Sequence, residues 1–299
     1  MDKEKGTRTF YLTKFDASSG FYKRDMRFWS RLSCKENVSV KGTRKVETVD
    51  FDHFAKDNNI EYADFMKVDV EGAELDILKG SVNFIRNGLV LGVASEVTFV
   101  DVGEQPVFSE VDTFLRSQGF KLFDIEVSRF TREVLTQPEE LSEVGATANS
   151  GQVIGADVLY LRDGVAEIEE PEKVSRWNDN SILKLASIFE IYGLNDCAIE
   201  LLQAGKKKGY LKGLDIDYLM DLLTPQFMDR DLTYREHIKT LEYIRNKGYK
   251  NAISLIDIAR RDSRLIKHIL WGDLKAIGER YLPGQLKSFI RKNIFRRAT

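Results

Sequence analysis

The sequence predicts an α/β domain built on a parallel sheet, followed by an all-helical domain. Three observations predict this order: apolar strand-like runs alternate with amphipathic segments over 46–164, the stretch 162–181 is acidic and aperiodic, and helical spacing follows. Alternating strands and helices need right-handed crossovers, which produce a parallel sheet covered by helices. We therefore expect a sheet domain at 1–164, a linker at 165–180 and a helical domain at 181–299.

Composition excludes several classes of protein. The 299 residues are 42% hydrophobic and 31% charged, with a net charge of −2, as in an ordinary soluble protein with no global attraction to nucleic acid. The N-terminus has no apolar signal core, and no run of 18 apolar residues occurs, so we expect a cytoplasmic protein. Two cysteines and three histidines in unrelated contexts predict neither a disulfide framework nor a histidine-rich metal site.

The stretch FMKVDVEGAELDILKG, residues 65–80, contains most of the first predicted strand and the start of the helix that follows it. The apolar run ADFMKVDV (63–70) predicts a strand. Apolar residues at helical spacing follow it, namely Leu75, Leu78, Val82 and Ile85. Gly88 is placed to end this helix, because glycine is common just after a helix C-terminus.

Three more strands and one more helix follow. LVLGVASEV (89–97) is a nearly continuous apolar run, typical of a strand buried on both faces. The segment 108–118 has helical spacing and is followed by Gly119, and the runs 120–127 and 156–162 predict two strands. We expect the long polar segment between these last strands to be either a hairpin connection or a loop over the site.

Beyond the linker, the sequence predicts helices. Asn180 is placed to cap a helix that ends at Gly193, and DCAIELLQAGKKKG (196–209) supplies an antiparallel partner. The pair resembles one tetratricopeptide unit, but no second copy follows at a fixed period, which favours a plain helical hairpin.

The C-terminal tail LKSFIRKNIFRRAT is basic and carries an apolar stripe. Its basic residues are Lys287, Arg291, Lys292, Arg296 and Arg297, and it has no acidic residue. A segment of this kind can make weak contact with an anionic membrane surface, although a solvated terminal helix is the more common reason for the pattern.

Carboxylates gather where two neighbouring strands end. Asp69 and Glu71 lie at the carboxyl end of the strand at 63–70, and Glu96 lies at the same end of the next strand. Ligands of open parallel sheets bind beyond the carboxyl ends of the strands, so these side chains are expected to face one crevice. Gly72 leaves room for a close approach of backbone or ligand.

Helix capping is the alternative explanation for these acidic residues. Carboxylates near a helix start favour the helix dipole by roughly 0.3–1 kcal/mol each. Capping is the simpler interpretation for Glu71 and Glu74, whereas position alone supports capping and function equally for Asp69 and Glu96.

The ordered series of segments resembles the FkbM family of S-adenosylmethionine-dependent methyltransferases. FMKVDVEGAELDILKG resembles the family signature, and VETVDFDHF (46–54), GVASEVTF (92–99) and 108–125 resemble the segments around it. The similarity covers about residues 7–163. It implies a class I (Rossmann-like) methyltransferase sheet, S-adenosyl-L-methionine as cofactor, and methylation of a hydroxyl on a sugar, glycan or natural product.

The resemblance suggests roles for the residues at the strand ends. A hydroxyl acceptor must lose a proton, which a carboxylate can accept. Asp69 is the first choice for contact near the reacting methyl group and Glu96 the second, with Glu71 and Lys67 completing the catalytic candidates. Lys67 could steer Asp69 or an anionic substrate, or equally be a residue at the sheet edge whose charged end extends into solvent. The three carboxylates could also hold magnesium, but nothing in their spacing demands it, and we assign no metal ligands.

The sequence departs from the family in its cofactor half. No glycine-rich turn follows any predicted strand, and GATANSG (145–151) lies late in the chain. We therefore expect a partial sheet without its N-terminal cofactor half, no assignable cofactor-binding residues, and an open edge at 63–70 that could pair with a second copy.

This departure leaves a second function open, that of a non-catalytic binding or scaffold protein derived from a methyltransferase. A nicotinamide-dependent oxidoreductase is disfavoured, because no G-x-G-x-x-G sequence follows a strand.

Overall fold

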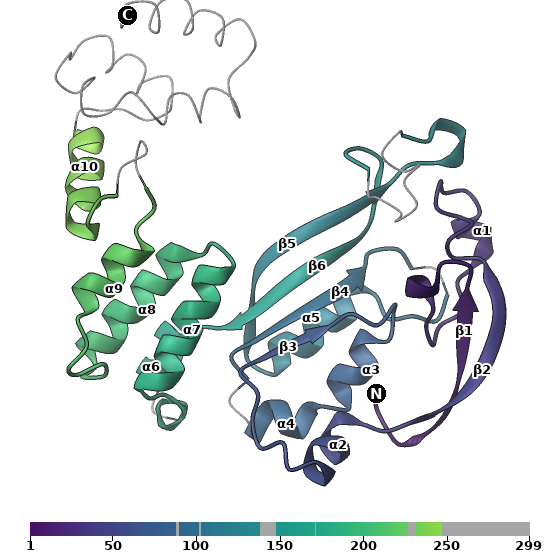
Figure 1. Cartoon of the computed structure of the whole chain (residues 1–299), viewed down its shortest axis with the longest axis horizontal. Coiled ribbons are helices and arrows are strands. Elements are labelled where there is room, and N and C mark those ends of the chain that lie inside the picture. The colour runs from purple at the N-terminus through teal and green to yellow at the C-terminus, as the bar shows by residue number, and fades with distance from the viewer. Residues whose placement is uncertain (88–89, 102, 138–147, 171, 227–230, 247–299) are drawn as a thin grey trace, which may run out of the picture. The chain divides into compact units, whose positions relative to one another are not determined.

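The computed structural model describes residues 1–87, 90–101, 103–137, 148–170, 172–226 and 231–246 (Figure 1). The chain divides into two compact units, Met1–Leu185 and Ala186–Thr299. A short helix, α6 (Gly164–Glu169), and a 3-10 turn, η4 (Val174–Arg176), lie in the segment expected to be a linker, and the domain boundaries proposed above stay a prediction.

The first unit contains a four-stranded mixed sheet. In spatial order its strands are β3 (Phe65–Val68), β4 (Gly92–Thr98), β6 (Gln152–Arg162) and β5 (Phe120–Phe130). β3 and β4 are parallel, as predicted, whereas β6 is antiparallel to both β4 and β5. The expectation of a wholly parallel sheet is therefore wrong for β6 alone, because β5, which is antiparallel to β6, has the same direction as β3 and β4. No crossover helix lies between β5 and β6 in the described residues, so these two strands form a long hairpin, one of the two predicted alternatives (Figure 1).

A separate two-stranded antiparallel sheet, which the periodicity of the sequence did not indicate, precedes this one. It pairs β1 (Gly6–Thr13) with β2 (Val40–Thr48). The connection between them holds η1 (Asp16–Ser18) and α1 (Met26–Trp29), and α2 (Phe51–Asp57) follows β2. This connection brings residues of the N-terminal segment to the ends of the larger sheet.

The predicted first helix is divided into two. α3 (Glu74–Lys79) and α4 (Val82–Asn87) are separated at Gly80, where a Cβ atom would collide with the backbone oxygen of Asp2. The N-terminal segment thus packs against the break. Gly88, expected to end the helix, lies outside the described residues.

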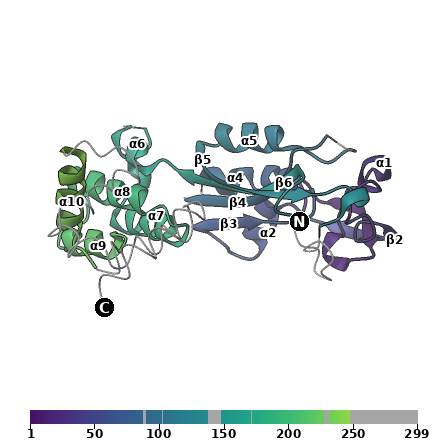
Figure 2. The ribbon, with the colours of Figure 1, turned by 90° about the horizontal axis from the view of Figure 1, so that it is seen from above.

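The next helix follows the prediction closely. α5 (Phe108–Ser117) runs along the strands (Figure 2), and Gly119 after it has φ +90°, as expected of a glycine beyond a helix end. The main core lies between these helices and the sheet, and its fully buried side chains include Leu78, Ile85, Val93, Leu115 and Tyr160.

Ile85→Val is expected to lower the free energy of unfolding by about 0.5–1.5 kcal/mol, because it removes one methylene from a fully buried position. Urea denaturation of the whole chain measures the change. An unaltered urea midpoint would show that the surrounding side chains fill the space of the lost methylene without a loss of stability.

β3 is an edge strand, as the sequence predicted. In the described part of the chain no strand pairs with its second edge. Lys67 is exposed on β3, and a charged side chain on an edge strand hinders pairing with other chains. Association of two copies through this edge stays a prediction.

The described part of the second unit is helical, and so is the segment that leads into it. They are α7 (Asp179–Ile191), which crosses the boundary, α8 (Asn195–Lys207), α9 (Ile216–Leu223) and α10 (Tyr234–Asn246). Residues 192–194 join the two helices of the predicted hairpin, and Gly193 has φ +73°.

The N-terminal cap of α7 is Asn178, not Asn180. The Asn178 side chain accepts the Ser181 N–H at 3.0 Å, and the Ser181 hydroxyl accepts the Asn178 N–H at 2.9 Å, a reciprocal pair that leaves Asn180 inside the helix. The basic tail at 286–299 lies outside the described residues. Within the part that is described, no helix is both long and apolar enough to cross a membrane.

Candidate functional site

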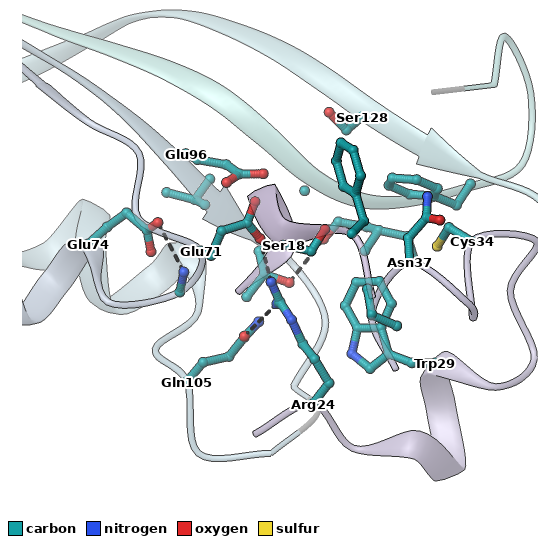
Figure 3. Close-up of a pocket in the computed structure, with 18 of the residues that line it drawn as sticks. Ser18, Arg24, Trp29, Cys34, Asn37, Glu71, Glu74, Glu96, Gln105 and Ser128 are labelled. Carbon is teal, nitrogen blue, oxygen red and sulfur yellow. Dashed lines mark hydrogen bonds and ion pairs between the residues drawn. The ribbon is translucent and has the colours of Figure 1, made fainter. Parts of the chain in front are cut away.

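A cavity of about 270 Å³ lies beyond the carboxyl ends of β3 and β4 (Figure 3). Its walls come from the β1–β2 connection, the turn after β3, the end of β4 and the adjoining ends of β5 and β6. The lining combines three carboxylates, one guanidinium, one carboxamide near them and three aromatic rings: Glu71, Glu74, Glu96, Arg24, Gln105, Phe15, Trp29 and Phe130. The cavity therefore has a charged part and an aromatic part.

The turn after β3 has an unusual backbone. Glu71 has φ +58°, a left-handed conformation that costs a non-glycine residue about 1–2 kcal/mol. Gly72 has φ +104°, and a Cβ atom there would lie 2.9 Å from the Gln105 side-chain oxygen. A Cβ atom on Gly20 would lie 2.8 Å from the Glu71 carbonyl oxygen. The close approach predicted at Gly72 is confirmed, and packing on both sides holds Glu71 in place.

Glu71 forms an ion pair rather than a helix cap. The Arg24 Nη2 atom donates to the Glu71 carboxylate at 2.6 Å, and Arg24 Nη1 donates to the Gln105 side-chain oxygen at 2.9 Å. The N-cap residue of α3 is Ala73. The capping interpretation is therefore wrong for Glu71, and the guanidinium has two partners inside the cavity.

Glu74 satisfies the backbone of the same turn. Its side chain is buried and accepts the N–H groups of Val70 and Gly72, both at 3.0 Å. Burial raises the pKa of the Glu74 carboxyl, and these hydrogen bonds oppose the rise. Burial likewise raises the pKa of Glu71, while the charge of Arg24 lowers it. Glu74 thus has the local structural role that the capping interpretation suggested.

Glu96 differs from Glu71 and Glu74 because no described residue forms a hydrogen bond or an ion pair with its side chain. Its side chain enters the cavity from β4 (Figure 3). Burial, followed by the negative charges of Glu71, Glu74 and Asp69, raises its pKa to about 8. Glu96 is therefore a carboxyl group that exchanges its proton near neutral pH, as acid–base residues do.

Asp69 and Lys67 lie outside the cavity lining. They form the predicted contact with each other at 2.9 Å, and their side chains are 48% and 60% exposed. Asp69 acts on the cavity through its charge, which contributes to the raised pKa values of Glu71 and Glu96. The structure thus brings together Glu71 and Glu96 of the four sequence candidates, and the catalytic roles of all four stay predictions.

A buried ionic network supports this arrangement. Arg8 on β1 contacts the carboxylates of Asp2 and Asp76, both at 2.8 Å. The Tyr22 hydroxyl donates to the same Asp76 carboxylate at 2.7 Å. Because Tyr22 precedes Arg24 by two residues and Asp76 follows Glu74 by two, the network ties the loop of Arg24 to the helix that follows Glu71.

Sequence reasoning missed Arg24, Trp29 and Gln105. They lie in segments without helical or strand periodicity, and the motif that resembles a family does not include them. Only the folded contacts identify them. In the described ranges, no group of three or more His, Cys, Asp or Glu side chains is arranged to hold a metal ion.

Glu96 is expected to make stability fall as pH rises. Between pH 4.5 and about 8 the folded carboxyl keeps a proton that the unfolded chain has lost, so the folded state binds more protons and its stability decreases with pH until about pH 8. Thermal unfolding of the wild type and Glu96→Gln between pH 5 and 9 tests this. The variant should show a smaller decrease in Tm, whereas parallel curves would contradict the raised pKa.

By its fold and its site, this part of the chain is an α/β domain with a candidate acid–base site at the carboxyl ends of two parallel strands. Residues 4–122 match the family model of the methyltransferase FkbM domain. The match confirms the resemblance seen in the sequence and includes Arg24, Glu71 and Glu96. No curated protein and no solved structure matches the chain significantly.

Proposed function

We propose that the protein is an S-adenosylmethionine-dependent methyltransferase that methylates a hydroxyl group of a small molecule or glycan. The observation that carries the proposal is the Glu96 carboxyl group. It lies inside the family domain, faces a cavity, has no hydrogen-bond partner in the described residues, and has a pKa of about 8. These are the properties of a general base for a hydroxyl group.

The charged part of the cavity fits the cationic end of the cofactor. Three carboxylates face one guanidinium, which is already paired with Glu71, so the lining favours a positive charge. S-adenosylmethionine supplies, when bound, a methyl group on a positively charged sulfur that is activated for transfer. Glu71 and Glu96 are the residues that would face this charge.

The described residues would act on the acceptor in a simple way. Glu96, in its ionised form, accepts the proton of the acceptor hydroxyl, which leaves electron density on the oxygen that forms the new bond. Arg24, which also donates to Gln105, holds Glu71 in the same cavity. Fixed orientation of the acceptor in a partly enclosed cavity lowers the entropic part of the barrier.

The rate of methyl transfer is expected to depend on the ionisation of Glu96. kcat/KM should rise with pH and level off above an apparent pKa of about 8, because only the carboxylate accepts a proton. A pH profile from 6 to 9.5 with a hydroxyl acceptor measures this. A rate independent of pH over that range would remove Glu96 from the role of base.

Calorimetric titration of the 299-residue chain with S-adenosylhomocysteine tests the proposal directly. Saturable binding at one site supports a methyltransferase. In the described residues, no strand is followed by a glycine-rich turn. Cofactor binding is therefore the measurement that distinguishes a methyltransferase from a non-catalytic protein. No binding by a folded chain would instead favour a non-catalytic binding or scaffold protein, for which the open edge of β3 offers a pairing surface.

A further inference from the structure

Arg24 supplies the one positively charged side chain in the described lining of the cavity. Its side chain is only 10% exposed, and both terminal nitrogens are engaged, one by Glu71 at 2.6 Å and the other by Gln105 at 2.9 Å. A free arginine fork is the side chain best suited to bind a carboxylate or phosphate, because it offers two parallel N–H donors. Here the fork is already occupied.

The rest of the charged part of the cavity offers an anion no free cation. Glu74, Glu96 and the already paired Glu71 line it, so an incoming carboxylate or phosphate would lie against acidic side chains only. The cavity is therefore unfavourable to an anionic ligand.

The other part of the cavity is suited to an uncharged ring. Phe15, Trp29 and Phe130 contribute aromatic rings, and Asn37 contributes a carboxamide that can form a hydrogen bond with a polar ligand atom. Aromatic side chains stack on flat or apolar ring faces and gain free energy from the area buried. A neutral ring with one polar substituent matches both parts of the cavity.

We propose that Glu71 is a specificity residue: by occupying the cavity's guanidinium, it excludes acceptors that carry a carboxylate or phosphate and reserves the cavity for uncharged cyclic acceptors. The inference names the substrate class of the site and rests on the proposed function. Glu71 is fixed for this role by its left-handed backbone and by the close packing of Gly20 and Gly72 around it.

Two fragments with the same ring and different charge test the proposal. Benzyl alcohol and benzoate are titrated at pH 7 into the isotope-labelled full chain, with the Trp29 indole N–H resonance as the reporter. We expect the wild type to bind benzoate at least about tenfold more weakly than benzyl alcohol. Glu71→Gln, which leaves Arg24 without a neutralising charge, is expected to reduce this ratio at least about tenfold or to reverse it.

Two further variants make the test specific. Glu36→Gln removes an exposed carboxylate that pairs with Lys14 outside the cavity lining, and it should leave the ratio unchanged. Arg24→Gln removes the cation and should keep benzoate excluded. This variant can still be titrated if Glu71→Gln does not fold. Equal binding of both fragments by the wild type, an unchanged ratio in folded Glu71→Gln, or tight benzoate binding by Arg24→Gln would each overturn the proposal.

The fragment titrations need neither cofactor nor methyl transfer, so they fail or succeed separately from the proposed function. A wild type that rejects benzoate but does not bind S-adenosylhomocysteine retains the charge selectivity and loses the assignment as a methyltransferase. A wild type that binds S-adenosylhomocysteine but accepts benzoate loses only the role of Glu71 in specificity.

Discussion

Glu96→Gln is expected to slow methyl transfer by about 10²–10⁴-fold, the usual contribution of a positioned general base. Glutamine has nearly the same shape as glutamate but cannot accept the proton. Because Glu96 makes no hydrogen bond or ion pair in the described residues, the substitution leaves no partner group unsatisfied. The folded structure should therefore persist, and the loss should appear in kcat rather than in the amount of folded protein.

The measurement is steady-state methyl transfer to a hydroxyl acceptor, with circular dichroism to verify the fold. Glu126→Gln is the matched control, since Glu126 is an exposed carboxylate on strand β5 of the same sheet and does not line the cavity. Its rate should equal that of the wild type. Wild-type kcat in folded Glu96→Gln would show that another group removes the proton.

Arg8→Met is expected to destabilise the folded chain by about 3–5 kcal/mol, the usual cost of removing one partner from a buried ionic group. The substitution would leave the carboxylates of Asp2 and Asp76 without their common cation, and their side chains are only 3% and 9% exposed. The Tyr22 hydroxyl, whose pKa is raised to about 12 chiefly by burial, donates to Asp76 but carries no compensating charge.

Equilibrium unfolding in urea measures this loss. Arg27→Met is the matched control, because Arg27 pairs with Asp25 through a side chain that is 92% exposed, and solvent screens such a pair so that its loss changes stability little. Losses of equal size in the two variants would show that the network of Arg8 contributes no more than an exposed ion pair. A larger loss for Arg8 would establish that the buried network stabilises the fold more than an exposed ion pair does.

Local patterns in the sequence determined several elements of this protein. The apolar run at 63–70 predicted β3, the run at 89–97 predicted β4, and the helical spacing before Gly119 predicted α5. The order of these segments also indicated the FkbM family, which the match at 4–122 supports. Each of these inferences depends on residues close together in the chain, where periodicity and turn preferences act.

Tertiary structure alone decided the direction of β6 and the break between α3 and α4. Periodicity does not specify strand direction, and β6 is antiparallel because a hairpin, not a crossover, precedes it. The break at Gly80 depends on the backbone of Asp2, which is distant in the sequence but adjacent in the fold. Neither feature has a local signal.

The candidate site shows the same division. The sequence determined that Glu71 and Glu96 follow or end two neighbouring strands, and this placed them at one edge of the sheet. The tertiary structure paired Glu71 with Arg24, 47 residues away, placed Asp69 outside the cavity lining, and left Glu96 half-buried among other acidic side chains. The reason is physical: burial and charge at a site depend on every chain segment that packs around it, whereas a sequence pattern describes one segment at a time.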